Sequence, residues 1–392
     1  MNIPKLRFKN FNNEWRKTKL SKLLTESKEK SSGNDNGIVL TSSRKGLFPR
    51  STYFDGREEN NTVGYSLVPK RSFTYRQMSD DNTFFINLNR DFELGLVSPE
   101  YPVFTTNDLL DTIYFANFIN DSRSFKQYCQ LQKKGGTRTR LYFKVLKELE
   151  ITIPSIDEQK IIGSFFETLS RKIQLQQEKI NLLKDQKQGY IQKIFSQEIR
   201  FKGENGQEYP EWEEHLIQDY LTESRVLGNK GDKAKKLTVK LWGKGVVEKQ
   251  EILEGSSNTQ YYVRYANQFM YGKLDFLNCA FGIVPEHLDG YESTLDSPAF
   301  DICPNINPLY LLYFILQKSF YKKYGEKANG SRKAKRIHVE DFYNMPIKIP
   351  IIEEQEKIAK LLSLFDQKIE KEQNKLESLY QQKQAFMQKM FI

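Results

Sequence analysis

The side chains best suited to chemistry in this sequence are basic, and they gather in two runs. Eight Lys and Arg residues lie in 122–147 without an acidic neighbour, and eight lie in 318–336 with one acidic residue among them. Each run contains a glycine turn (Gly135-Gly136 and Gly330), which suits a loop that meets a phosphate backbone. A solvated charge run is the alternative interpretation, and recurrence at matching places disfavours it.

Two further segments mix basic, aromatic and polar residues among turn signals: 42–54 with 75–82, and 240–249 with 271–273. Arg, Lys, Gln and Asn are the side chains that hydrogen-bond base edges in a major groove, whereas Tyr75 and Tyr271 are equally compatible with a core. The predicted DNA-binding residues are Arg44, Lys45, Arg50, Tyr75, Arg76, Lys133, Lys134, Arg138, Arg140, Lys240, Lys244, Tyr271, Lys273, Arg332, Lys333 and Arg336.

Motifs for catalysis are missing from the sequence, so we predict no catalytic residue. No Walker A loop and no G-x-S-x-G motif occur. A nuclease-like E-x-K pattern at Glu158–Lys160 begins a predicted helix, and its counterpart at Glu354–Glu356 replaces the lysine, which favours helix capping. With three histidines and three widely spaced cysteines, we also predict no metal site and no disulfide framework.

The composition agrees with a polyanion partner. The chain has 392 residues and a net charge of +10, and its length predicts two or three domains. Neither a signal-peptide core nor a stretch of about 18 apolar residues is present, so we expect a cytoplasmic protein with no membrane partner.

An internal repeat organises the chain. Residues 151–195 align without a gap with residues 347–391, at an offset of 196, and 18 of 45 positions are identical. The starts of the two copies also match, as RFKNFNNEW followed by LTES and RFKGENGQEYPEW followed by LTES. We therefore predict a tandem duplication.

The aligned tails predict two long helices of about 39 residues, each roughly 55–60 Å long. Apolar residues alternate at spacings of three and four, with Lys, Glu and Gln between them, which is a heptad pattern. The predicted coiled-coil seam contains Ile162, Phe166, Leu169, Ile173, Ile180 and Leu183 in the first helix, and Ile358, Leu362, Phe365, Ile369, Leu376 and Leu379 in the second. Two separate amphipathic helices, each docked on its own domain, are the alternative.

The duplication predicts that the two helices run antiparallel. Polar seam positions suggest a register in which Lys187 faces Glu372 and Gln176 faces Lys383, so that each buried lysine has a polar partner.

The remaining parts of the two copies contain short β-rich runs, turn signals and one apolar helical stretch each, which indicates an α+β (mixed α/β) fold. The expected architecture is two pseudo-twofold-related globular recognition domains separated by a long antiparallel two-helix coiled coil. The predicted boundaries are 1–153 and 198–349 for the domains, and 154–197 and 350–392 for the helices.

The chain resembles the specificity subunits of type I restriction–modification systems. The resemblance rests on the RFK…EW entry to each half, on Gly95-Leu-Val-Ser-Pro99, on KLWGKGVVEK, and on the doubled P-x-I-[DE]-E-Q…K-I…K…Q-K-Q helices. It implies that two target recognition domains each read one half of a split, asymmetric site in double-stranded DNA, and that the helices set the spacing.

The same resemblance implies partners and cofactors. Two methyltransferase (modification) subunits dock on the helices and supply S-adenosylmethionine binding and adenine-N6 methylation. Restriction subunits supply ATP-dependent translocation and Mg²⁺-dependent cleavage, so this chain itself holds no cofactor. Two other functions remain open from the residues alone: an interaction scaffold that gathers proteins, and a stand-alone nuclease or methyltransferase.

Overall fold

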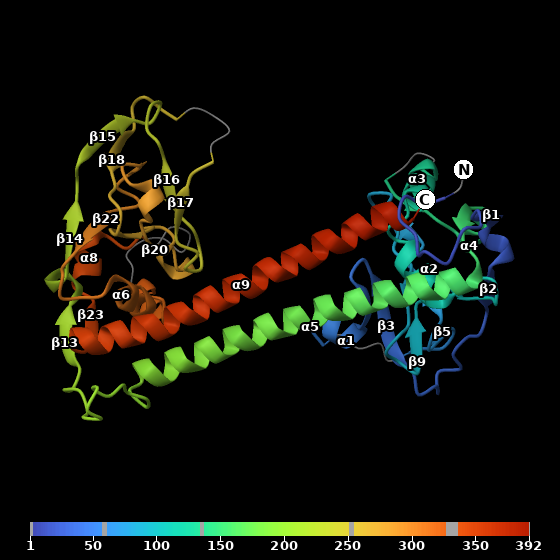
Figure 1. Ribbon diagram of the computed structural model, residues 1–392, viewed down its shortest axis with the longest axis horizontal. Helices are drawn as coiled ribbons and strands as arrows, with labels where there is room; N and C mark the ends of the chain where they lie inside the picture. Colours follow the sequence, from blue (N-terminus) through green and yellow to red (C-terminus); the bar gives the residue numbers. More distant parts are fainter. Residues whose placement is uncertain (1–2, 57–60, 134–136, 251–254, 327–335, 392) are drawn as a thin grey trace. The chain divides into compact units, whose positions relative to one another are not determined.

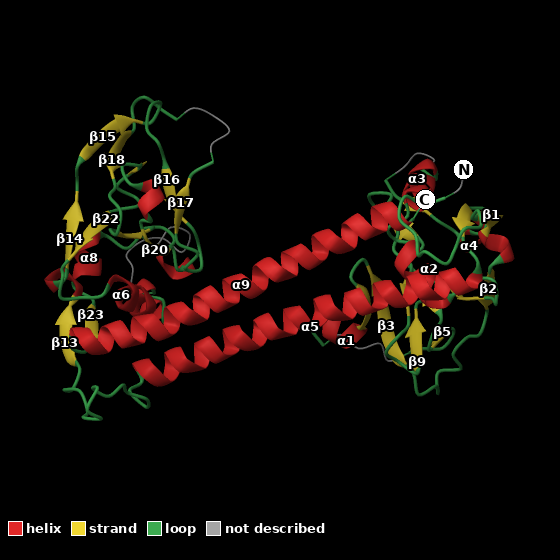
Figure 2. Ribbon diagram, in the orientation of Figure 1, coloured by secondary structure: helices red, strands yellow, loops and turns green. Residues whose placement is uncertain are grey.

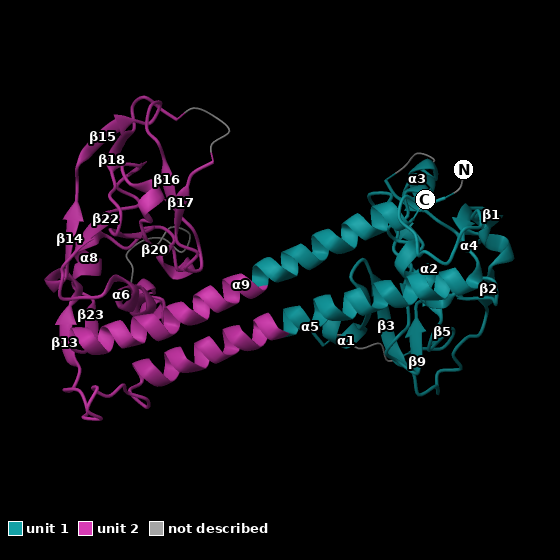
Figure 3. Cartoon of the chain, viewed as in Figure 1, with its two compact units in different colours: residues 1–178, 373–392 teal, residues 179–372 magenta. Residues whose placement is uncertain are grey.

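The computed structural model describes residues 3–56, 61–133, 137–250, 255–326 and 336–391. The chain divides into two compact units (Figure 3): the first unit contains residues 1–178 and 373–392, and the second contains residues 179–372. Both are mixtures of short strands and helices (Figure 2), which confirms the predicted mixed α+β class. No helix of the described ranges is both long and apolar enough to cross a membrane.

The first unit is built on a four-stranded sheet in the order β2-β10-β6-β8, formed by Leu24–Ser27, Val103–Thr106, Phe73–Thr74 and Asn87–Leu88. A second sheet has the order β4-β3-β9-β5, formed by Gly46–Pro49, Ile38–Ser43, Leu94–Val97 and Ser66–Pro69. The first unit also contains two separate strand pairs: β1 (Arg16–Lys19) with β12 (Glu150–Ile153), and β7 (Met78–Ser79) with β11 (Thr139–Arg140).

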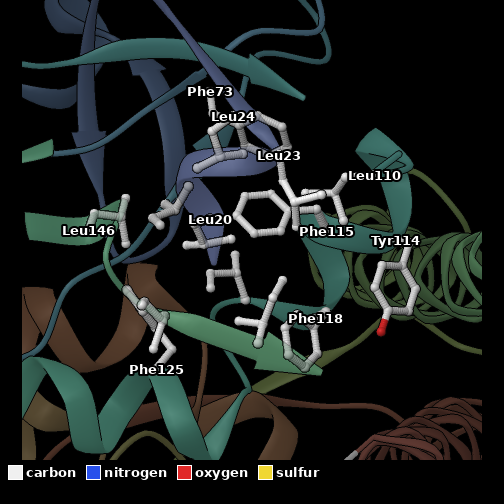
Figure 4. Close-up of a cluster of buried hydrophobic side chains, with 14 of the residues drawn as sticks. Leu20, Leu23, Leu24, Phe73, Leu110, Tyr114, Phe115, Phe118, Phe125 and Leu146 are labelled. Carbon is white, nitrogen blue, oxygen red and sulfur yellow. The ribbon is translucent and has the colours of Figure 1, made fainter. Parts of the chain in front are cut away.

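The helices of the first unit are α1 (Arg50–Tyr53), α2 (Thr112–Phe118), α3 (Arg123–Leu131) and α4 (Phe143–Leu146), together with parts of two long helices. Aromatic and aliphatic side chains from β6, α2, α3 and α4 meet in one core (Figure 4). Strand β8 begins only at Asn87, because the Asn120 side chain, rather than a neighbouring strand, bonds both backbone groups of the preceding Ile86.

The second unit repeats part of this plan. Its sheet β14-β22-β19-β20 is formed by Leu221–Ser224, Ala299–Ile302, Phe269–Tyr271 and Phe281–Ile283, and the pair of β13 (Glu213–Leu216) with β23 (Pro346–Ile349) matches β1 with β12. Helices α6 (Pro308–Ile315), α7 (Lys318–Gly325) and α8 (Val339–Tyr343) correspond to α2, α3 and α4.

The units differ in the remaining strands. Instead of the β4-β3-β9-β5 sheet, the second unit has the sheet β15-β18-β21, formed by Leu227–Lys230, Gln260–Val263 and Glu292–Ser293, and the hairpin of β16 (Leu237–Val239) with β17 (Val246–Glu248). Each unit is therefore a shared frame that carries its own set of strands.

Two long helices, α5 (Ile156–Phe195) and α9 (Ile352–Met390), contribute to both units (Figure 1). In the first unit they run antiparallel, with Phe165 against Phe386 at 5.1 Å between ring centroids. In the second unit they are also antiparallel, with Tyr190 against Phe365 at 5.4 Å. The compact units thus cut across the predicted domain boundaries, because each contains one half of each helix.

Seam residues lie along the contacting faces of these helices. Nine of the twelve are buried, and Leu169, Phe365 and Leu376 are half-buried. Ile162 and Phe166 join the core of the first unit, where Phe391 from the other helix stacks on Phe166 at 5.3 Å. The helices therefore belong both to a helix pair and to the cores of the units.

The predicted register is wrong by about one heptad. Lys187 bonds Asp366 at 2.6 Å rather than Glu372, whose carboxylate accepts from Lys179 at 3.0 Å. Lys383 donates to Ser170 at 3.0 Å rather than to Gln176. The cause lies outside the helix pair, because the terminal aromatic residues of each helix must reach a core and thereby fix the alignment.

Each long helix begins at a buried carboxylate. Glu158 is fully buried and accepts two hydrogen bonds of 2.7 Å from Arg7. These bonds raise the pKa of the Arg7 guanidinium. Glu354 is buried in the same way and accepts from Arg200 at 2.9 Å and from Trp212 at 3.1 Å. The RFK entry of each copy therefore supplies the cation that its helix start requires.

The glutamine that follows each carboxylate ties the helix to the rest of its unit. Gln159 accepts from the Asp111 backbone N–H at 2.8 Å, and Asp111 caps α2. Gln355 accepts from the Asn307 N–H at 2.8 Å, and Asn307 caps α6. The P-x-I-[DE]-E-Q motif is thus a packing motif.

Replacing Glu158 with Gln should destabilise the first unit by about 3 kcal/mol, because it leaves the mostly buried Arg7 guanidinium without a countercharge. Denaturant unfolding measures this cost. The control is Lys17→Ala, which breaks an exposed pair with Glu150 and should cost less than about 1 kcal/mol. Equal losses from the two variants would contradict the structural role of the buried pair.

Candidate nucleic-acid interface

A basic pocket of about 720 Å³ lies on the first unit. Arg44 and Lys45 reach it from the turn between β3 and β4, which closes at Gly46 with a φ of 130°. Arg50 reaches it from the start of α1, and Arg76 from the segment after β6. The structure therefore brings four of the predicted DNA-binding residues together around one hollow.

Carboxylates hold part of this basic surface in place. Arg44 bonds Asp81 at 2.5 Å, and the same carboxylate accepts from the Thr83 hydroxyl at 2.6 Å and from Ser79 at 2.9 Å. These bonds keep the pKa of Asp81 well below its usual range, with Arg44 as the largest cause. Arg138 bonds the neighbouring Asp80 at 2.9 Å. The guanidinium groups are thus oriented before any ligand arrives.

Aromatic residues line the same pocket, although they are absent from the predicted site. Tyr53 ends α1 and Phe54 follows it, and both are exposed. Arg50 lies 5.6 Å from the Phe54 ring centroid. The signal that could have found them is the spacing of these rings three and four residues after Arg50, which brings them to one side of a helical turn. They add flat apolar surface beside the positive charges.

A smaller pocket adjoins the first and is lined by Arg76, Gln77, Glu100 and Arg140, among others. Arg140 is exposed and donates to the Tyr142 hydroxyl at 3.2 Å, and this bond raises the pKa of its guanidinium, with Glu100 a weaker cause. The side chains here belong to the segment after β6 and to β11, which lie side by side through the pairing of β7 with β11.

The second unit has a matching cluster 196 residues further along the chain. Lys273, Asp296 and Arg336 occupy the positions that correspond to Gln77, Glu100 and Arg140, and Arg336 bonds Asp296 at 3.3 Å. Lys273 is half-buried, and burial lowers the pKa of its ammonium group, an effect that Glu223 and Asp296 oppose. Lys273 and Arg336, both predicted site residues, therefore share one cluster.

The prediction that Tyr75 and Tyr271 contact DNA is wrong. Both side chains are fully buried. The Tyr75 hydroxyl donates to the Leu141 carbonyl at 2.9 Å, and the Tyr271 hydroxyl donates to the Ile337 carbonyl at 3.1 Å. Their repetition reflects a shared core contact, which a sequence pattern of aromatic and basic residues does not distinguish from an exposed one.

Lys240 and Lys244 lie on the turn between β16 and β17 and are exposed. The turn is fastened by backbone bonds from Trp242 to Asn278 and from Gly243 to Cys279, each 2.8 Å. The exposed Trp242 is a further surface aromatic residue that the predicted site omits.

The remaining predicted residues are only partly described. Lys133 is exposed just after α3. Lys134, Arg332 and Lys333 lie outside the described residues. Within the described ranges, no group of three or more His, Cys, Asp or Glu side chains is arranged to hold a metal ion.

A second kind of hollow recurs beside the long helices. In the first unit, a hollow of about 810 Å³ lies between α9 and the start of α3. Its lining from α9 consists of Tyr380, Lys383, Gln384 and Met387. In the second unit, a hollow of about 370 Å³ lies between α5 and α6. Its lining from α5 consists of Lys184, Lys187, Gln188 and Ile191. These two sets of four residues are 196 positions apart, so the groove belongs to the repeated frame.

A repeated frame that carries two unlike basic surfaces defines the chain as a duplicated recognition protein. A model of the type I restriction modification DNA specificity domain matches residues 59–185 and 300–381, more than half of the chain. The chain therefore belongs to the family of type I restriction–modification DNA specificity proteins, which confirms the resemblance seen in the sequence.

Solved structures support the same fold. The S subunit of a type I restriction–modification system from M. genitalium is 14% identical, with 100% of this chain and 99% of that chain covered and a TM-score of 0.60. A chain from a structure that addresses complex assembly and conformational transition of the type I R-M system is 13% identical, with 96% and 97% covered and a TM-score of 0.57.

Proposed function

We propose that this chain selects the DNA site of a type I restriction–modification complex, and that each unit reads one half of a bipartite, asymmetric double-stranded site. The observation that carries the proposal is the division of each unit into a repeated frame and unlike strands. A repeated frame gives both readers the same attachment. Unlike strands give them different surfaces for base edges, beside a basic pocket in the first unit and the cluster of Lys273 and Arg336 in the second.

Chemistry in this proposal belongs to partner subunits. Methyltransferase subunits bind S-adenosylmethionine and methylate adenine N6, and restriction subunits use ATP and Mg²⁺ for translocation and cleavage. The chain is non-catalytic and acts in the cytoplasm, where its DNA and partners are found. Its basic residues, including Lys45 and Arg138, supply affinity for phosphates that falls as salt rises.

Reconstitution tests the proposal. The chain is mixed with candidate methyltransferase subunits and a library of DNA, and methylated adenines are located by sequencing. We expect methylation at one split motif only when both proteins are present. If the chain binds partner proteins but prefers no DNA sequence, the result would favour an interaction scaffold instead. Methylation by this chain alone would show that it has its own active site.

The paired grooves beside the long helices support docking of two copies of one partner, since equivalent residues line both. We propose that each groove receives one methyltransferase subunit. The groove of the first unit offers the half-exposed ring of Tyr380 next to Lys383 and Met387, which combines apolar area with a polar rim.

Tyr380→Glu should lower the number of bound methyltransferase subunits from two to one per chain, because it places a charge in one groove only. Native mass spectrometry counts the subunits. Tyr265→Glu changes a tyrosine that is similarly exposed but lies outside both grooves, and it should leave two subunits bound. If the Tyr380 variant also retains two, the partner docks elsewhere.

The two long helices set the spacing between the half-sites in this proposal, and their length should therefore set the spacer. Inserting seven residues after Glu178 together with seven after Glu372 keeps the heptad faces and adds about 10 Å, the rise of roughly three base pairs. We expect methylation to move to a longer spacer while both half-site sequences stay the same. If the variant still methylates DNA but keeps the original spacer length, the helices do not set the distance between the half-sites.

A further inference from the structure

The two units carry one local backbone frame, which presents unlike side chains at equivalent positions. The Gln77 carbonyl accepts from the Leu141 N–H at 2.9 Å, and the Lys273 carbonyl accepts from the Ile337 N–H at 3.1 Å. These are equivalent bonds, because each residue of the first pair lies 196 positions before its counterpart. The backbone therefore presents residues 77 and 273 in the same way.

Buried tyrosines reinforce this frame. The hydroxyls of Tyr75 and Tyr271 bond the carbonyls of Leu141 and Ile337, the residues that also supply the N–H groups described above. Each tyrosine thereby clamps the segment that carries an exposed arginine against the segment that carries residue 77 or 273. A fully buried clamp with identical partners in both units gives the two positions a fixed place.

The two positions share one carboxylate and one arginine. Gln77 lies in the small pocket with Glu100 and Arg140, and Lys273 lies near Asp296 and Arg336. The first pocket also contains Arg76, whose counterpart is Gly272. Arginines beside the position are suited to phosphate contacts, which set orientation without reading sequence. Beside this shared carboxylate and arginine, Gln77 presents a neutral amide and Lys273 presents a cation, so the two positions offer different groups to a base.

We propose that Gln77 and Lys273 are specificity-determining residues, each of which reads one base of its half-site. Gln77 bonds an adenine through its side-chain amide, which matches the N6–H and N7 groups, and Lys273 donates to the O6 and N7 acceptors of a guanine. Tyr75 and Tyr271 are positioning residues for this contact. The inference rests on the proposed function and adds the residue and the base class at one position of each half-site.

Two substitutions test the proposal in the complete complex with methyltransferase subunits, by sequencing the DNA that is bound or methylated from a library randomised at both half-sites. Gln77→Lys should change adenine to guanine at one position of the first half-site, with a shift in preference of at least roughly 10-fold. Lys273→Gln should make the reverse change in the second half-site. All other positions should stay the same.

Matched controls separate charge from readout. Gln207→Lys and Lys348→Gln make the same changes at exposed positions outside the two clusters, and neither should alter any base preference. Gln77→Ala adds no charge and should relax preference at the same single position. Tyr75→Phe removes the hydroxyl that bonds Leu141, and it should broaden the base preference at the same position while the melting temperature stays unchanged. A tyrosine with a purely structural role would change the melting temperature and not the base preference.

The outcomes separate the two proposals. A wild-type complex with no preferred bipartite sequence would overturn the proposed function, and this inference with it. A wild-type complex with a clear motif, together with a Gln77→Lys variant and a Gln77→Ala variant that retain it at every position, would overturn this inference alone.

Discussion

A buried carboxylate at the start of each long helix is the constraint on which the rest of the structure depends. Glu158 and Glu354 have no exposed surface, and an isolated charge in that environment would be costly. Each is balanced by the arginine of the RFK entry, so the first residues of a copy must lie against its own helix. The adjacent glutamine then fixes the loop that caps α2 or α6. One short motif therefore joins the entry strand region, the apolar helix and the long helix of a unit into a single core, and it does so twice.

This arrangement leaves the rest of each unit free to differ. The sheet β2-β10-β6-β8 matches β14-β22-β19-β20, and the pair β1-β12 matches β13-β23, whereas the remaining strands of the two units have different orders and different connections. The tyrosine clamps belong to the constant part, where they support the unlike residues Gln77 and Lys273. Changes in the unlike strands therefore leave the groove beside the long helices and the helix start unaltered.

The sequence predicted the repeat, the mixed fold, the long helices and their antiparallel direction, because these follow from periodicity and from an ungapped self-alignment. It did not predict the register. Periodicity describes the faces of two helices, but Lys187 is held by Asp366 and by the ring of Tyr313 from α6. The Tyr313 hydroxyl donates to the same Asp366 carboxylate. The predicted DNA-binding site was correct only in part, because burial, like the register, depends on contacts between distant parts of the chain. Charges such as Arg44 and Arg336 are surface residues in almost any fold, whereas the burial of Tyr75 depends on contacts with residues far away in the chain.

The polar residues of the seam also show why the helix pair is not an independent coiled coil. Lys383 is mostly buried, burial lowers the pKa of its ammonium group, and its bond goes to Ser170, with the charge of Asp121 nearby. Lys187 lies 4.8 Å from the Tyr313 ring centroid. In both units the globular part therefore supplies groups that a two-helix seam lacks. Because the helix ends are fixed by core aromatics and by these lysine contacts, the segments around 178 and 372 are the places where the helices can change length without disturbing either core.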